Sequence, residues 1–394
     1  MKIAIVVGDD AASDGPMSLC SALTAQGHQV TAYVRRRDRR NARKGTEQDY
    51  QVVATRVGPT DPRSDREVLP FVGDWAARLE RNWSSDQPDI VHAYGWLGGL
   101  AAQLAARRRR LPTVQTFQGL AATLRTGTVN GPDNAAERRR IESLLTRNAG
   151  WVTGESTASV AALAKLRHGR ARLSVLTRGV DVERYTPVGP ALPQGDLLRI
   201  LCLAANPLPY NGFDTVIRTL PRVPGAEVIV AETDAADQGH DEARAALKSF
   251  ATQLGVADRV RFMGTVADNE LPTLLRSADV LACTPRVPPR ATTVLQAMAS
   301  GVAVVTLPVG VLDDIVVNGV TGLVVSASNP AEFASALRSL EAHRFLRQSM
   351  GAAGRSRALS RFTWDRVALE SLNIYERLNS PDPRAAARPP VRAH

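Results

Sequence analysis

One segment of the sequence groups side chains that could bind a charged ligand. They are Arg286, Arg290, Thr292, Thr293 and Gln296. The two arginines flank a proline-rich loop, and the other three stand at the start of an expected helix. The first turn of a helix presents unpaired N–H groups and partial positive charge, so this grouping could hold a phosphate. A strand–helix–strand unit with an empty loop would produce the same pattern.

The elements around this segment determine where those side chains would lie. An apolar strand is expected at 280–283, a loop at 285–289, a helix from about 291 to Gly301 and a second strand at 302–306. This order is typical of an open parallel sheet, whose ligands usually bind at the carboxyl ends of the strands. The helix N-terminus would then point at the mouth of the loop.

Strands and helices alternate along the chain in two series, which predicts an α/β protein with two doubly wound, Rossmann-like domains. The first series of strands is expected at 2–8, 30–34, 89–93, 113–117, 151–154 and 173–176. The second series is expected at 198–203, 227–231, 259–263, 280–283, 303–306 and 323–325. A stretch rich in proline and glycine at 186–196 separates them, so we place the domains at 1–188 and 196–362. A long amphipathic helix is expected at 363–379 and a disordered tail at 380–394.

Length and composition agree with two domains of a soluble protein. The chain has 394 residues, of which 44% are hydrophobic and 22% charged, and no apolar run reaches the length of a membrane span. The N-terminus begins in a strand and lacks the features of a signal peptide. Cys20, Cys202 and Cys283 stand in apolar surroundings without metal-type spacing, which indicates buried thiols in a reducing compartment. We therefore expect a cytoplasmic protein with no metal site and no cofactor.

The positive charge is concentrated in the first half of the chain. Residues 1–190 contain 28 Lys and Arg against 19 Asp and Glu, whereas the remainder contains 21 against 20. A basic half suits an anionic acceptor or the anionic inner face of a membrane. Solvated helix faces carrying the arginines at 107–110 and 138–140 explain the charge equally well. Nucleic acid is not expected, because no aromatic residues alternate with the arginines as stacking platforms.

Several segments resemble the family 4 glycosyltransferases of the GT-B fold. The first is PDIVHAYGWLGGLAA at 88–102, and the second is RGVDVERYTP at 178–187, which resembles the family's NGVDxxxFxP. The others are LGVADRVRFMG at 254–264, QAMASGVAVV at 296–305, NGVTGLVV at 318–325 and FTW at 362–364. These motifs span nearly the full length of the chain.

The resemblance implies both a fold and an activity. Two domains would face a cleft, and the C-terminal helix would cross back to the first domain. The activity would be transfer of a sugar from a nucleotide diphosphate sugar, with retention at the anomeric carbon. The donor would lie against the second domain and an unknown acceptor against the first. No metal ion would be needed, because family members use a helix dipole and cations to stabilise the departing diphosphate.

This chain departs from the family pattern at the positions that carry the chemistry. The family's donor-site arginine and lysine correspond to Asn206 and Asn211, the latter followed by Gly212. Its pair of glutamates falls on Pro288 and Gln296, and its two active-site histidines fall on Tyr94 and Gln118. The glycine-rich loop after the first strand is shortened and ends at Gly15. His92 keeps the first histidine of the motif, either as an acceptor-side residue or as a packed core histidine.

Two hypotheses from different classes follow. The first is a working glycosyltransferase that uses Arg286, Arg290 and the helix N-terminus for the diphosphate and Gln296 for the ribose. Hydrogen bonds to charged groups are worth roughly 1.5–3 kcal/mol each, so donor binding would be weaker than in the family by several kcal/mol. The alternative is a catalytically inactive glycosyltransferase-like protein that binds or regulates a partner, for example another glycosyltransferase.

Overall fold

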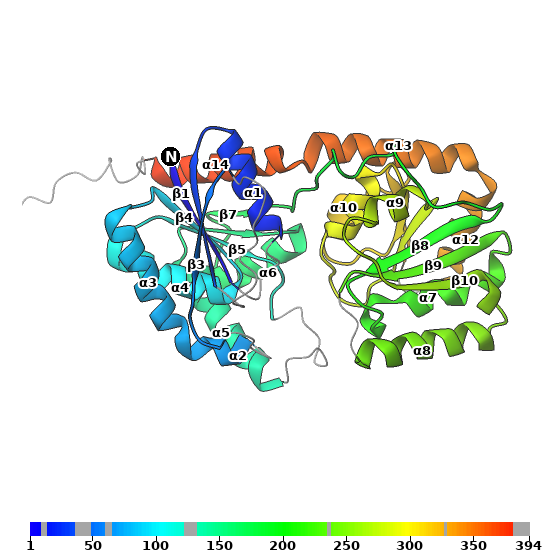
Figure 1. Cartoon of the computed structure of the whole chain (residues 1–394), viewed down its shortest axis with the longest axis horizontal. Coiled ribbons are helices and arrows are strands. Elements are labelled where there is room, and N and C mark those ends of the chain that lie inside the picture. The colour runs from blue at the N-terminus through cyan, green and yellow to red at the C-terminus, as the bar shows by residue number, and fades with distance from the viewer. Residues whose placement is uncertain are drawn as a thin grey trace, which may run out of the picture. The chain divides into compact units, whose positions relative to one another are not determined.

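The computed structural model describes residues 1–8, 14–35, 49–59, 65–121, 132–234, 238–326 and 329–380. The chain divides into two compact units (Figure 1). The first unit comprises Met1–Glu155, Ser159–Leu176 and Val367–His394, and the second comprises Ser156–Ala158 and Thr177–Arg366. Within the described ranges, no helix has the length and apolar character needed to cross a membrane.

The first unit is built on a parallel sheet of seven strands in the order β3-β2-β1-β4-β5-β6-β7. Its strands are β1 (Lys2–Val7), β2 (Gln29–Arg35), β3 (Gln51–Thr55), β4 (Ile90–Tyr94), β5 (Thr113–Phe117), β6 (Trp151–Gly154) and β7 (Leu173–Val175). The central strands β1, β4 and β5 are buried along nearly their whole length because helices cover both faces of such a sheet. The edge strand β3 is mostly exposed, and for this reason the apolar pattern did not predict it.

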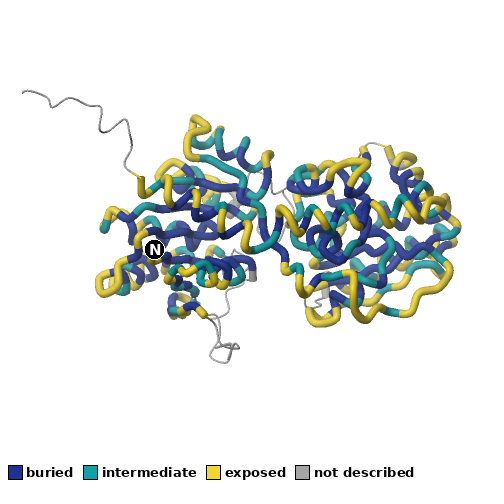
Figure 2. The backbone as a smooth tube through the Cα atoms, turned by 90° about the horizontal axis from the view of Figure 1, so that it is seen from above, coloured by how far each residue is buried: buried dark blue, intermediate teal, exposed yellow. Residues whose placement is uncertain are grey.

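Six α-helices between residues 14 and 167 of the described chain belong largely to this first unit. They are α1 (Asp14–Ala25), α2 (Asp65–Val68), α3 (Val72–Ser85), α4 (Trp96–Arg109), α5 (Pro132–Asn148) and α6 (Thr157–Arg167). Helix α3 shows how they are anchored, since Trp75, Leu79 and Trp83 repeat at intervals of four and are fully buried. Figure 2 shows the buried strands enclosed by the more exposed helices and loops.

The second unit repeats this architecture with six parallel strands in the order β10-β9-β8-β11-β12-β13. The strands are β8 (Leu198–Ala204), β9 (Ala226–Glu232), β10 (Val260–Thr265), β11 (Val280–Cys283), β12 (Ala303–Thr306) and β13 (Gly322–Val324). The helices are α7 (Phe213–Thr219), α8 (Gln238–Gln253), α9 (Leu271–Arg276), α10 (Thr292–Ala299), α11 (Leu312–Ile315), α12 (Pro330–Ala342) and α13 (Arg344–Arg361). All six strands were expected from the sequence.

The last helix, α14 (Trp364–Asn379), begins in the second unit and ends in the first. From Val367 onward it packs with the first unit, where Tyr375 is fully buried and its hydroxyl lies 2.7 Å from His92 Nδ1. The two doubly wound sheets and the returning helix confirm the predicted fold class. The cleft, and the domain limits at 188 and 196, stay predictions. Residues 9–13 of the shortened loop and the tail at 381–394 lie outside the described residues, and the predicted end of that loop at Gly15 is part of the first turn of α1.

Candidate functional site

Three loops leave the carboxyl ends of adjacent strands in the second unit. They follow β8, β11 and β12, and direct contacts join them. The Arg286 amide donates to the Tyr210 carbonyl over 2.8 Å, and Thr284 Oγ1 donates to the Gly212 carbonyl over 2.7 Å. A Cβ added to Gly310 would meet Pro288 Cβ at 2.8 Å. The sheet order therefore brings the predicted donor-side residues together at one edge.

The two asparagines predicted for the donor side bond to their own loop. Asn206 is 8% exposed, and its Nδ2 donates to the Tyr210 hydroxyl over 2.8 Å. Asn211 Nδ2 donates to the Asn206 carbonyl over 2.8 Å and to Asn206 Oδ1 over 3.0 Å. These amides hold the loop after β8 in a fixed turn, and they bring no charge to the site.

The two arginines of the neighbouring loop differ in their surroundings. Arg286 Nη2 pairs with Asp214 Oδ2 at 2.6 Å, and its Nη1 donates to the Pro209 carbonyl over 2.9 Å. Arg290 is exposed, and no described residue forms a hydrogen bond or ion pair with it. The charge of Arg286 is thus compensated within the protein, whereas Arg290 keeps its donors for solvent or a ligand.

Helix α10 begins two residues after Arg290. Its N-cap residue is Ala291, which provides no side-chain hydrogen bond, so no cap occupies the N–H groups of the first turn. Thr292 and Thr293 are half-buried in that turn. One turn further along, Gln296 Nε2 donates to the Tyr185 hydroxyl over 2.9 Å. The start of α10 can therefore offer N–H donors to an anion and one amide oxygen to a hydroxyl.

The residues predicted for the acceptor side lie at the corresponding edge of the first unit. Tyr94 ends β4, and its carbonyl accepts from the Gly8 amide over 3.1 Å. Gly15 is buried in the first turn of α1, and Gln118 is the first residue after β5. The described chain after Gln118 ends at Ala121, whose amide donates to the two carboxylate oxygens of Glu142 over 3.1 and 2.9 Å.

His92 lies inside the sheet, two residues before the edge. It is fully buried, with Nδ1 2.7 Å from the Tyr375 hydroxyl and Nε2 2.6 Å from Thr116 Oγ1. Burial lowers the pKa of His92 to about 3, so the imidazole is neutral. Its ring stacks on Tyr94 with centroids 4.5 Å apart. These are the surroundings of a histidine packed in the core. Because His92 is fully buried, it could affect an acceptor only indirectly, by positioning the Tyr94 ring.

Comparisons with known proteins agree with a chain built of two such units. The model of the family described as Glycosyltransferase Family 4 matches residues 17–184, and that of Glycosyl transferases group 1 matches residues 198–357. The chain belongs to the family 4 glycosyltransferases. A D-inositol 3-phosphate glycosyltransferase of Jonesia denitrificans is 27% identical over 92% of this chain and 89% of the relative. A glycogen synthase of Mycobacterium tuberculosis is 28% identical over 80% of this chain and 74% of the relative.

Solved structures show the same GT-B fold. The sucrose-phosphate synthase of Thermosynechococcus elongatus superimposes with a TM-score of 0.80 at 19% identity, covering 98% of this chain and all of that one. HepE of Anabaena, in complex with UDP and glucose, superimposes with a TM-score of 0.72 at 18% identity, covering 96% of this chain and all of that one. At these identities the likeness concerns the fold alone.

Some residues around the predicted donor side could not be found from the sequence. Asp214 pairs with Arg286, and Tyr210 accepts a hydrogen bond from Asn206. The sequence does not show these contacts, because they depend on how the loops fold against one another. Tyr185 did carry a signal, because it stands where the family motif has phenylalanine. Its additional hydroxyl is the group that Gln296 contacts.

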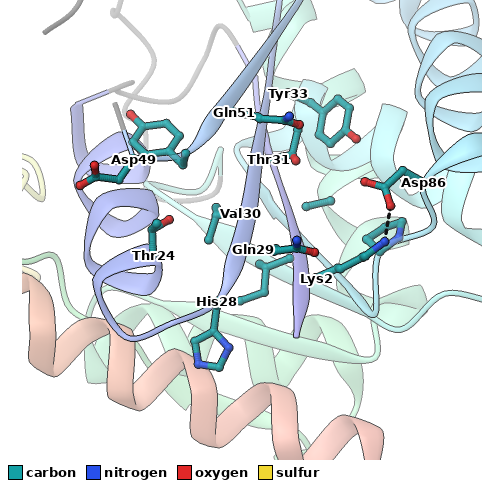
Figure 3. Close-up of a pocket in the computed structure, with 14 residues that line it drawn as sticks. Lys2, Thr24, His28, Gln29, Val30, Thr31, Tyr33, Asp49, Gln51 and Asp86 are labelled. Atoms are coloured by element: carbon teal, nitrogen blue, oxygen red, sulfur yellow. Dashed lines mark hydrogen bonds and ion pairs between the residues drawn. The ribbon is translucent and has the colours of Figure 1, made fainter. Parts of the chain in front are cut away.

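A separate pocket of about 510 Å³ lies in the first unit at the amino ends of β1, β2 and β3 (Figure 3). It is lined in part by Thr31, Gln51 and the Lys2–Asp86 ion pair. Tyr94 and Gln118 stand at the opposite, carboxyl ends of the strands of the same sheet, so the pocket is separate from the predicted acceptor side.

Across the described ranges, no group of three or more His, Cys, Asp or Glu residues could hold a metal ion.

Proposed function

We propose that this family 4 protein transfers a sugar from a nucleotide diphosphate sugar, with the donor bound at the carboxyl edge of the second unit. The observation that carries the proposal is the start of α10. It combines an uncapped first turn, an exposed Arg290 without a partner among the described residues, and Gln296 one turn further along. A nucleoside diphosphate has a matching order of groups: its negatively charged diphosphate would meet the first turn of α10 and Arg290, and its ribose hydroxyls would meet Gln296. The bound UDP and glucose of HepE agree with this class of ligand.

Each group then has a defined role. The N–H groups of Thr292 and Thr293 and the Arg290 guanidinium stabilise the diphosphate as it leaves the anomeric carbon. The oxygen of Gln296 accepts a hydrogen bond from the ribose. Asn206, Asn211 and Gly212 keep the neighbouring loop in place, and Arg286 supports it through Asp214. In the first unit, Tyr94 and Gln118 contact the acceptor hydroxyl, and Gly15 contributes to the acceptor side. The product retains the anomeric configuration, and no metal ion takes part.

Incubation with UDP-, GDP- and ADP-sugars, with and without a chelator, tests this function. We expect slow release of the nucleoside diphosphate, unchanged by the chelator, and faster release when the right acceptor is present. Gln296→Ala should lower the rate at limiting donor. Activity that the chelator abolishes and manganese restores would contradict metal-independent catalysis.

A second candidate function rests on the loop after β8. Its two asparagines and Tyr210 bond to one another, and Arg286 pairs with Asp214, so this part of the site would offer no unpaired cation to a phosphate. A non-catalytic protein that binds a partner glycosyltransferase would have this property. Under this alternative, no sugar nucleotide would be turned over by the protein alone, and activity would appear in a co-purified partner.

A further inference from the structure

Uncharged polar side chains line the pocket at the amino ends of β1, β2 and β3 (Figure 3). Gln29 and Thr31 are two positions apart on β2, so both project from the same face of the sheet. Gln51 is the β3 partner of Thr31 and projects from that face as well. No described residue forms a hydrogen bond with these three side chains. Their donors and acceptors are therefore available to a molecule in the pocket.

The pocket begins where the cover provided by α3 stops. Trp83, near the end of α3, packs edge-on against Tyr33 of β2, with ring centroids 6.0 Å apart. The helix ends at Ser85. Thr31 and Gln29 precede Tyr33 on that face of β2, and they line the pocket. Its volume of about 510 Å³ lies within the roughly 300–1,000 Å³ of small-molecule sites.

The charges of the pocket argue against an anionic ligand. Of the residues that line it, only Lys2 carries an ammonium group, and its Nζ pairs with Asp86 Oδ1 at 2.5 Å. Burial lowers the pKa of His28, so its ring is neutral at pH 7. Asp49 adds an exposed carboxylate. A phosphate would therefore meet no unpaired cation among these residues.

A nucleobase is also a poor fit, because an uncharged base is held mainly by stacking on an aromatic face. The two tyrosines of the lining, Tyr33 and Tyr50, are only 6% and 8% exposed. A sugar fits better, since each of its hydroxyls can both donate and accept, as the amides and the hydroxyl of the pocket can.

A buried hydroxyl on α1 also favours a ligand with hydroxyl groups. Thr24 lines the pocket, and its Oγ1 is buried with no hydrogen-bond partner in the described chain. A buried polar atom without a partner is unfavourable, so a ligand that bonds to it removes this cost.

We propose that this pocket binds a neutral saccharide through Gln29, Thr31 and Gln51, apart from the predicted donor and acceptor sides. β1 spans six residues, so its two ends lie about 20 Å apart. A saccharide at the amino ends of the strands therefore stays bound while a sugar is transferred at the carboxyl edge. The pocket keeps a glycan on the protein between transfers. This role rests on the proposed function, whereas binding of the saccharide does not.

Saturation-transfer NMR of the full chain tests the pocket. The probes are glucose, galactose, mannose and maltotriose, with uridine and inorganic phosphate representing the other two classes of ligand. Thr31→Val and Gln51→Ala each remove one polar group, and Gln51→Trp fills the pocket from an exposed position. Gln118→Ala probes the predicted acceptor side, and Gln348→Ala is an exposed control in the other unit. Circular dichroism checks that every variant is folded.

We expect at least one of the four sugars to give a saturable signal. Thr31→Val and Gln51→Ala should each weaken this binding about 2- to 10-fold, the size of one neutral hydrogen bond. Gln51→Trp should abolish it. Gln118→Ala and Gln348→Ala should bind the sugar like the unmodified chain.

Three results would overturn the inference. The first is no saturable signal from any of the sugars. The second is sugar binding that all the pocket variants leave unchanged. The third is tighter binding of uridine or phosphate than of every sugar, lost in Gln51→Trp. Failure of the proposed function is seen separately, as absence of nucleoside diphosphate binding, and leaves these sugar titrations valid.

Discussion

Arg286 and Arg290 stand four positions apart in one loop, yet only one of them remains available for a ligand. The sequence predicted both as phosphate-binding candidates, because their type and proximity to a helix start are equal. It could not predict that β8 and β11 are neighbours, which brings Asp214 and the Pro209 carbonyl to Arg286. The sequence could therefore predict which side chains were candidates for binding phosphate, but not which of them would be paired within the protein.

The buried histidine provides a prediction at the residue scale. The pKa of His92 is lowered to about 3 by burial, against an ordinary value of 6.5, so the folded state favours the neutral ring. Its contribution to stability is complete above pH 6.5 and is lost as the pH falls toward 3, because the unfolded chain binds the proton first. The free energy of unfolding should fall by about 1.4 kcal/mol per pH unit through this window. Urea unfolding at pH 7.5 and 5, followed by tryptophan fluorescence, measures the change.

His92→Gln is the test variant and His343→Gln is its control, since His343 is exposed. Trp75, Trp83, Trp96 and Trp151 all lie in the first unit, so fluorescence reports mainly on its unfolding. The His92 variant should be less stable at pH 7.5 and lose less stability on acidification. Equal pH dependence in all three proteins would show that His92 does not set this slope.

At the scale of elements, the loop after β8 depends on a close approach that only glycine permits. Gly212 has a φ of +74°, and an added Cβ would overlap the Thr284 carbonyl oxygen. The strands on either side were predicted from their apolar runs. The contact between their loops was not, because the sequence does not show that β8 and β11 are adjacent. The apolar runs therefore predicted the strands, whereas the contacts between the loops after β8 and β11 depend on the order of the strands in the sheet.

Gly212→Ala should destabilise the second unit by at least about 3 kcal/mol, because it combines backbone strain with a backbone clash. Gly255→Ala is a matched control. Gly255 has a φ of +67° and no atom within 4 Å of an added Cβ, so it carries the strain alone, about 1 kcal/mol. Urea unfolding followed by circular dichroism compares the two. Equal losses would show that the approach to Thr284 is not tight.

At the scale of the whole molecule, many arginines bind backbone carbonyls of the chain itself. Arg259 donates to the carbonyls of Leu220, Val223, Pro224 and Ala226. Arg355 and Arg357 act in the same way at the ends of α10 and α11. The N–H groups of these arginines are therefore used within the protein, while their charge still counts in the net +10. Contact with an anionic membrane, expected from the basic first half, stays a prediction.

Arg259→Lys should cost about 2 kcal/mol of stability, because an ammonium cannot reproduce the planar fork that reaches several carbonyls. Arg261→Lys is the control, since Arg261 is exposed two residues away. Thermal unfolding of both variants measures the difference. A similar midpoint for the two would mean that the carbonyl contacts of Arg259 contribute little.

The measurement that tests the central claim most directly is calorimetric titration of UDP, GDP and ADP against the unmodified chain, Arg290→Gln and Arg261→Gln. The account predicts that at least one diphosphate binds the unmodified chain. Arg290→Gln should weaken this binding about 10-fold or more and reduce its dependence on salt, because one charged contact is lost. Arg261→Gln should bind like the unmodified chain. Absence of binding by all three diphosphates, or equal affinity of the Arg290 variant, would contradict a donor site at the start of α10.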